Sequence, residues 1–129
     1  MFADAFRHHS TVALTTFRTD GSEAQSLVSV AVTDDGRAVF RTYAETWKAR
    51  RLRRDPRVRA TPTTFRGRPV APGIPARARR LDGADAAAAR RALARRHPFL
   101  HGVAVPVAHR LRGLHTQHYE LLPPARDGA

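Results

Sequence analysis

Short blocks in which apolar and polar positions alternate fill the first third of the chain, which is the pattern of β-strands buried on one face. Residues 12–18 form the first block, residues 24–33 the second and residues 38–43 the third. The second block is the most regular, because three of its valines fall on one face: Val28, Val30 and Val32. Asp20-Gly21 and Asp35-Gly36 separate the blocks and are favourable pairs for tight turns. We therefore predict three antiparallel strands joined by short hairpins.

A basic helix is predicted directly after the third strand. Thr46 is a suitable N-cap, because its hydroxyl can accept a hydrogen bond from a free backbone N–H of the first turn. Residues 47–54 then give about two helical turns, and Pro56 disfavours helical backbone at the residue before it.

The second half of the chain predicts more strands and one longer helix. Residues 57–65, 74–81 and 115–122 have strand character, and Pro62 marks the first of these as an edge strand or a bulge. An alanine-rich helix is predicted from Asp82 or Gly83 to Arg96, a short helix over residues 106–112 and a frayed tail over residues 123–129. The pattern indicates one mainly β domain over residues 1–129, a small β-barrel decorated by helices.

Arginine dominates the charge of the chain. Lysine and arginine together number 23 and Lys48 is the only lysine, which leaves 22 arginines and a formal net charge of +12. Such a balance favours anionic partners, namely nucleic acid, an anionic membrane or a polyanionic small molecule. Aromatic residues make up 7% of the chain and do not interleave with the arginines, so base stacking on RNA or DNA is poorly supported.

Several other classes of function lack residue patterns in this sequence. The chain has no cysteine, no apolar run of membrane-spanning length and no signal-peptide pattern, and we expect a cytoplasmic protein without a membrane partner. The seven histidines do not fall at metal-ligand spacings, so no metal is predicted. No nucleophile elbow or pair of catalytic carboxylates is recognisable, and no catalytic residue is assigned. If the protein is an enzyme, a bound cofactor supplies the chemistry.

One anion site follows from the residues alone. A helix N-terminus carries unpaired N–H groups and a partial positive charge. Arg41, Thr42 and Lys48 flank the N-terminus of the predicted basic helix, so their side chains are candidates to hold a phosphate. The alternative is that this helix presents an ordinary solvated basic face.

The order of these segments resembles a known family. The strings VALTTFRTDG, FRTYAETWKARRLRRDPRV, RGRP, ARARRLDG, RRALARRHP and HYELLP are similar to the split β-barrel flavin and deazaflavin oxidoreductases related to pyridoxamine 5′-phosphate oxidase. The similarity is greatest to the branch that uses coenzyme F420, and it extends over residues 12–123. Its most specific part is the threonine and lysine of TYAETWK followed by LRRDPRV.

The resemblance implies a homodimeric, six-stranded antiparallel split β-barrel of the FMN-binding type, with the cofactor in a groove between subunits. It implies an F420-dependent oxidoreductase that moves hydride between the reduced deazaflavin and an electron-poor small molecule such as an enone, quinone or tetrapyrrole. The alternatives are a barrel that binds FMN or a haem derivative, and a non-enzymatic binder of polyanions or nucleic acid. The residues that the resemblance assigns to the cofactor are Arg41, Thr42, Trp47, Lys48 and Arg51 near the phosphate, with Ser26, Leu27 and Val28 beside the ring.

Two departures from the family pattern concern the ring pocket. Family members often have Pro-Val-Trp in the second strand, where this chain has Leu27-Val28-Ser29. The asparagine of the family's Lys-x-x-Asn is Arg51 in this chain. The phosphate-holding residues are thus present, and the departures bear on which ring and which substrate are preferred.

Overall fold

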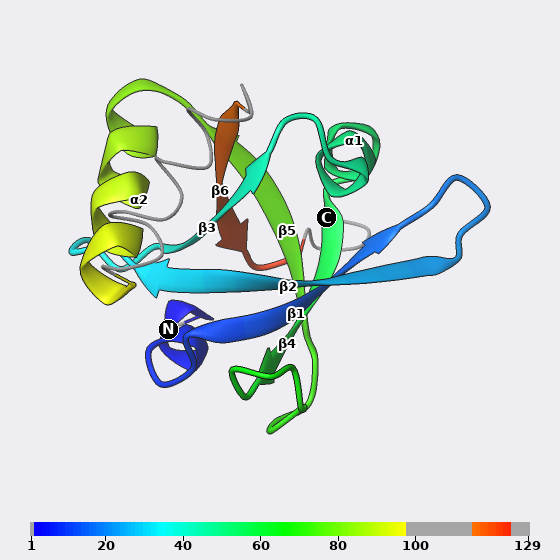
Figure 1. The fold of residues 1–129 in the computed structure, drawn as a ribbon, viewed down its shortest axis with the longest axis horizontal. Coiled ribbons are helices and arrows are strands. Elements are labelled where there is room, and N and C mark those ends of the chain that lie inside the picture. Colours follow the sequence, from blue (N-terminus) through cyan, green and yellow to red (C-terminus); the bar gives the residue numbers. More distant parts are fainter. Residues whose placement is uncertain (1, 98–114, 125–129) are drawn as a thin grey trace.

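The computed structural model describes residues 2–97 and 115–124 and shows a closed six-stranded antiparallel β-barrel (Figure 1). The strands are β1 (Thr11–Phe17), β2 (Glu23–Val32), β3 (Ala38–Tyr43), β4 (Arg57–Thr63), β5 (Ile74–Leu81) and β6 (Thr116–Leu122). The helices are a 3-10 turn at Phe2–Phe6, α1 (Trp47–Arg54) and α2 (Gly83–Arg96). The mainly β, six-stranded barrel prediction is therefore confirmed, whereas the helix predicted over residues 106–112 lies outside the described residues.

Strand order around the barrel is β1-β2-β3-β6-β5-β4. Two consecutive hairpins join β1, β2 and β3, as predicted. Their turns contain Gly21 and Gly36, at φ values of 86° and 84°. Both angles lie in the left-handed region that glycine adopts without steric cost. The chain then crosses the barrel, so that β6 closes it between β3 and β5.

The barrel interior holds the main apolar core. Its completely buried members include Phe6, Val12, Leu14, Val30 and Phe40, and α1 contributes Leu52 at one end of the barrel. A second, smaller core lies outside the barrel, where Ala89, Ala92 and Leu93 of α2 pack on β2, β3 and β5. These three residues form the face of α2 that covers the sheet, and Figure 1 shows this helix lying on the opposite side of the molecule from α1.

Pro62 shows why a proline is tolerated within β4. The strand ends at Thr63, two residues earlier than predicted, and residues 64–67 turn back toward the barrel. Pro62 is paired with Val12 of β1, whereas the pairing of β4 with β5 stops at Ala60. Beyond Ala60 this side of β4 faces the following connection, where the N–H of Val70 donates to the carbonyl of Pro62 at 3.0 Å. The missing N–H of Pro62 therefore removes no bond of the β4–β5 ladder.

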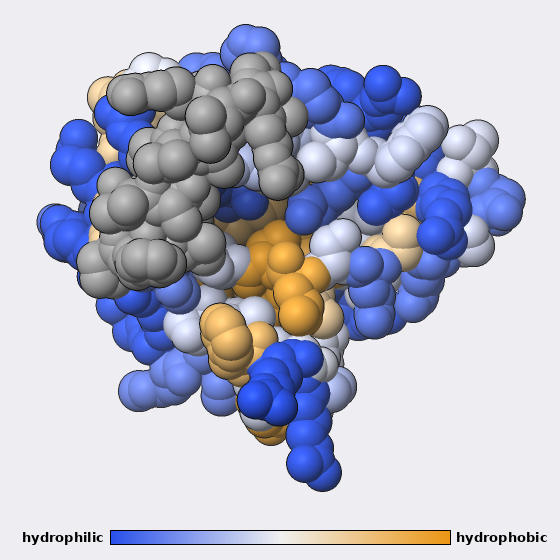
Figure 2. Space-filling view, in the orientation of Figure 1, coloured by the Kyte–Doolittle hydropathy of each residue, from blue (hydrophilic) through white to orange (hydrophobic). Residues whose placement is uncertain are grey.

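An apolar patch interrupts the hydrophilic surface near the middle of one face, over β2 (Figure 2). The exposed large apolar side chains of the described residues are Leu27, Trp47, Phe65 and Val70. Leu27 of β2 lies against the β4–β5 connection, since a Cβ atom added to Gly67 would come within 3.0 Å of Leu27 Cδ1. Leu27 and this connection therefore form one continuous surface.

Candidate functional site

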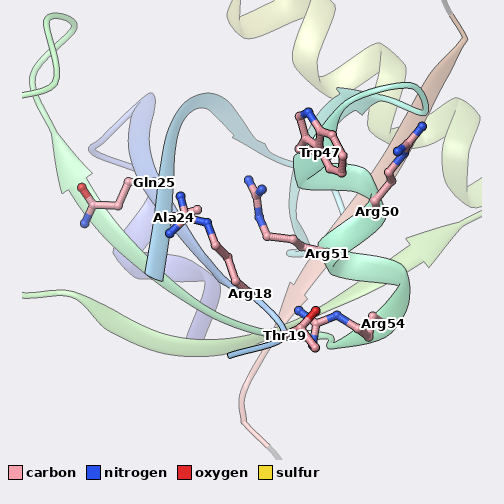
Figure 3. A pocket seen from close by; sticks show the side chains of 8 residues that line it. All are labelled: Arg18, Thr19, Ala24, Gln25, Trp47, Arg50, Arg51 and Arg54. Atoms are coloured by element: carbon pink, nitrogen blue, oxygen red, sulfur yellow. The ribbon is translucent and has the colours of Figure 1, made fainter. Parts of the chain in front are cut away.

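A large pocket lies between α1 and the β1–β2 hairpin. It is open to solvent, has a volume of about 820 Å³ and is lined by Arg18, Thr19, Ala24, Gln25, Trp47, Arg50, Arg51 and Arg54. We call it the arginine pocket, because four of these eight residues are arginines and none is acidic. Figure 3 shows Arg18 and Arg51 reaching into the space between α1 and the hairpin, with Trp47 and Arg50 at one end.

The helix forms here because its first turn is capped as predicted. Thr46 Oγ1 accepts a hydrogen bond from the N–H of Ala49 at 3.2 Å and donates to the carbonyl of Tyr43 at 2.8 Å. Such a cap contributes about 1 kcal/mol of stability. It fixes the start of α1 against the end of β3, so that Trp47, Arg50, Arg51 and Arg54 repeat at helical spacing along the face that lines the pocket.

Hydrogen bonds to the hairpin hold three of the four arginines in place. Arg51 Nε donates to Thr16 Oγ1 at 2.6 Å, and Arg18 Nη1 donates to the carbonyl of Glu23 at 2.7 Å. Arg54 donates to the carbonyl of Phe17, which ties the end of α1 to the end of β1. These hydrogen bonds already restrict the arginine side chains. Binding an anion in the pocket therefore costs little further side-chain entropy.

Like charges crowd this corner of the molecule. Burial and the neighbouring charges of Arg18 and Arg54 lower the pKa of the Arg51 guanidinium. Burial and the charge of Arg51 lower the pKa of the half-buried Lys48 ammonium. Neither Lys48 nor Arg51 has a carboxylate partner within the described part of the chain. A bound anion would relieve this repulsion, which is the electrostatic basis of an anion site.

Trp47 adds an aromatic surface at the rim of the arginine pocket. Its side chain is 71% exposed, and the guanidinium carbon of Arg50 lies 4.7 Å from the centre of its ring. The exposed indole offers a flat face on which an aromatic ligand can stack.

The structure does not bring all eight residues predicted for the cofactor to this pocket. Trp47 and Arg51 line it, and Lys48 lies beside Arg51. Thr42 is buried, with its Oγ1 3.3 Å from that of Thr46. Arg41 points to the opposite face of β3, because successive side chains of a strand alternate.

The three predicted β2 residues divide between surface and core. Ser26 and Leu27 line a smaller pocket of about 250 Å³ together with Ala13, Gln25, Arg66 and Gly67. Gln25 lines this smaller pocket and the arginine pocket, so the two are neighbours along β2. Val28 belongs to the barrel core and is 5% exposed.

Sequence reasoning missed Arg18, Thr19, Ala24 and Gln25 as lining residues of the arginine pocket, and it treated Arg50 and Arg54 only as a general basic patch. The helical spacing of residues 47, 50, 51 and 54 was a signal that would have found the α1 side of the pocket. No local signal shows that the β1–β2 hairpin projects beside α1, because the two segments meet only through the closure of the barrel.

One backbone edge of β2 is free beside these pockets. The N–H of Arg18 donates to Ser22 O, and that of Val30 donates to Ser10 O, both at 2.9 Å, so even-numbered residues of β2 bond to β1. The odd-numbered residues turn their backbone groups to the other side, where β3 pairs only with residues 30–32. Within the described residues, the backbone of Gln25 and Leu27 therefore has no strand partner on that side.

Solved structures of the same architecture were found by comparison of folds. A haem-binding protein from Mycobacterium smegmatis is 21% identical, with a TM-score of 0.63 over 88% of this chain and 46% of its own. HutZ, the haem storage protein of Vibrio cholerae, is 15% identical, with a TM-score of 0.69 over 95% and 88%. A putative pyridoxamine 5′-phosphate oxidase from Listeria innocua is 12% identical, with a TM-score of 0.57 over 97% and 95%.

The fold is a split β-barrel. Its structural neighbours are split-barrel proteins of the pyridoxamine 5′-phosphate oxidase type, at identities that establish the fold alone. This chain spans about half the length of the Mycobacterium smegmatis protein. No known family profile matches the sequence, and no curated protein matches it.

No helix of the described residues is long and apolar enough to cross a membrane. In the same residues, no three histidine, aspartate or glutamate side chains are grouped so that they would hold a metal ion.

Proposed function

We propose that this split barrel binds an anionic redox cofactor in the arginine pocket, and that it is an F420-dependent oxidoreductase. The observation that carries the proposal is the lining of the pocket, with four arginines, an exposed tryptophan and no acidic residue among the described ones. A phosphodiester with an oligoglutamate tail carries several negative charges, and guanidinium groups bind such oxygens through charge-assisted hydrogen bonds. The proposed substrate is an electron-poor small molecule of the enone, quinone or tetrapyrrole class.

Each part of the site would have a separate task. When bound, the reduced deazaflavin supplies the hydride. Arg51, Arg18 and Lys48 hold the charged part of the cofactor, and the free backbone edge of β2 offers donors and acceptors to the polar rim of a ring. Leu27, which is 50% exposed, offers an apolar surface at that edge. We assign no catalytic acid, and the proton that completes the reduction comes from solvent.

We further propose that two copies of the chain cover the apolar patch and complete the groove as a homodimer. Leu27 and Val70 are about half exposed, and Phe65 is 89% exposed on the adjoining connection. Apolar surface of this kind typically marks an interface. Leu27→Asp is expected to convert dimer to monomer in sedimentation experiments, whereas Arg91→Asp on the far helix α2 leaves the dimer intact. A monomeric wild-type protein would contradict this assignment.

Fluorescence titration with F420 and with FMN tests the cofactor proposal directly. Arg51→Ala is expected to weaken F420 binding about 10- to 100-fold, because a charge-assisted hydrogen bond contributes about 1.5–3 kcal/mol. Lys48→Ala should also lose affinity, because Lys48 lies beside Arg51. Arg91→Ala is the matched control, because it removes the same charge from an exposed position of α2. Absence of binding of either cofactor by the wild-type protein at high micromolar concentration would end the proposal.

FMN or a haem derivative is the second candidate ligand. Two structural neighbours are named for haem, and a phosphate or propionate would engage the same arginines. The described residues that line the arginine pocket include no histidine to ligate the iron, which favours F420 or FMN over haem. The absorption spectrum of protein copurified from a host that makes F420 distinguishes the three ligands.

Nucleic acid is the remaining alternative for a chain of net charge +12. Its signature would be an affinity for DNA or RNA that falls steeply with salt, with a slope set by the number of phosphates neutralised. We expect weak binding without such a slope.

A further inference from the structure

His118 on β6 is the one described residue with a buried side-chain polar atom that lacks any hydrogen-bond partner. The residue is 7% exposed, and its Nε2 atom is the atom without a partner. Buried polar atoms are nearly always satisfied, and an exception calls for a physical explanation. The imidazole stays neutral, because burial and the charges of Arg41 and Arg90 lower the pKa of His118 to about 4.

Arg41 of β3 lies directly opposite His118. The N–H of Ala44 donates to the carbonyl of His115, which makes Arg41 and His118 a non-hydrogen-bonded pair of the antiparallel ladder. In such pairs the two side chains are at their closest, with Cβ atoms about 4.5–5.5 Å apart. Both side chains lie on the face of the barrel that α2 partly covers, because Val39 and Leu81 share that face and pack on α2.

The Arg41 guanidinium has no carboxylate partner in the described part of the chain. Burial lowers its pKa, and of the neighbouring groups only Tyr43 opposes that effect. Glu120 is on the same face of β6, but its carboxylate accepts a hydrogen bond from Arg79 Nη2 at 2.7 Å. A half-buried cation without an anion is costly, and it lies beside an imidazole whose Nε2 atom also lacks a hydrogen-bond partner.

We propose that Arg41 and His118, with Arg90 of α2 at the rim, form a second anion site that binds a carboxylate group. The guanidinium presents two parallel N–H donors, which match the two oxygens of a carboxylate. In its Nε2–H tautomer, His118 donates to a further lone pair of the same group. A carboxylate carries one negative charge and costs less to bury than phosphate, because desolvation rises steeply with charge. This site is separate from the arginine pocket and does not depend on which cofactor that pocket binds.

The test follows the ring nitrogens of His118 by NMR in the wild-type protein at pH 7, without cofactor. Sodium acetate is titrated at constant ionic strength, with sodium chloride and sodium phosphate as comparison salts. We expect a saturable shift of the His118 nitrogens with acetate, no shift with chloride and at least tenfold weaker binding of phosphate. A shift that does not saturate with acetate, or that chloride reproduces, would overturn the proposal.

Two variants locate the effect in the Arg41–His118 pair. Arg41→Gln is expected to weaken acetate binding about 10- to 100-fold, because it removes the charge and the two-pronged donor. Arg91→Gln, one residue beyond Arg90 on the exposed face of α2, is the matched control and should bind acetate like the wild type. Equal acetate affinity in Arg41→Gln and the wild type would refute the site, whatever the result of the F420 titration.

Discussion

Phe40→Ala is expected to lower the free energy of unfolding by about 3–5 kcal/mol, the cost of removing a large aromatic side chain from a packed core. Phe40 is completely buried inside the barrel. Its ring stacks on that of Tyr119, with the centroids 5.3 Å apart and the planes inclined by 12°. The pair joins β3 to β6, which are 79 residues apart in the chain at this point (119 minus 40). The substitution therefore removes packing at the contact through which β6 closes the barrel.

Urea unfolding of the two proteins measures this difference. Arg91→Ala is the control, because Arg91 is exposed on α2 and its loss should change the unfolding free energy by less than about 0.5 kcal/mol. A loss below about 1 kcal/mol in Phe40→Ala would show that the core relaxes around the cavity, contrary to the packing described here.

Folding stability is expected to fall by about 3 kcal/mol as the pH drops from above 6.5 to about 4, because of His118 alone. The pKa of His118 is about 4 in the folded protein, against an ordinary value of 6.5. In this window the unfolded chain binds a proton that the folded chain does not, so acid favours unfolding. Each unit of difference in pKa corresponds to about 1.4 kcal/mol. The contribution of neutral His118 is complete above pH 6.5 and is lost progressively below it.

Comparison with His118→Gln isolates this effect. Glutamine keeps a polar side chain but does not titrate, so the slope of unfolding free energy against pH between 4.5 and 6.5 should be shallower than in the wild type. Hydrogen bonds from Thr33 and Arg37 lower the pKa of Asp35, and the pKa values of other carboxylates are lowered similarly. The contributions of these carboxylates to folding stability are therefore lost mainly at lower pH. Both proteins share that loss. Identical slopes in the two proteins would show that the pKa of His118 is not lowered in the folded state.

Local signals were sufficient for much of the fold and for one side of the site. Alternating positions predicted β1, β2 and β3, and the two Asp-Gly pairs predicted their turns, because strand periodicity and turn chemistry act over a few residues. The cap at Thr46 and the residues of α1 were predicted for the same reason, and with them Trp47, Lys48 and Arg51 as candidates.

Contacts between distant residues decided the rest. The position of β6 between β3 and β5, the approach of Arg18 to Arg51 and the pairing of Arg41 with His118 join residues that are at least 33 positions apart (51 minus 18). The identities of these residues do not encode such pairings, which arise only when the six strands close into a barrel. For that reason the sequence alone identified a basic helix after a strand, whereas only the folded chain separated Arg41 from Arg51 and placed a neutral histidine beside an unpaired arginine.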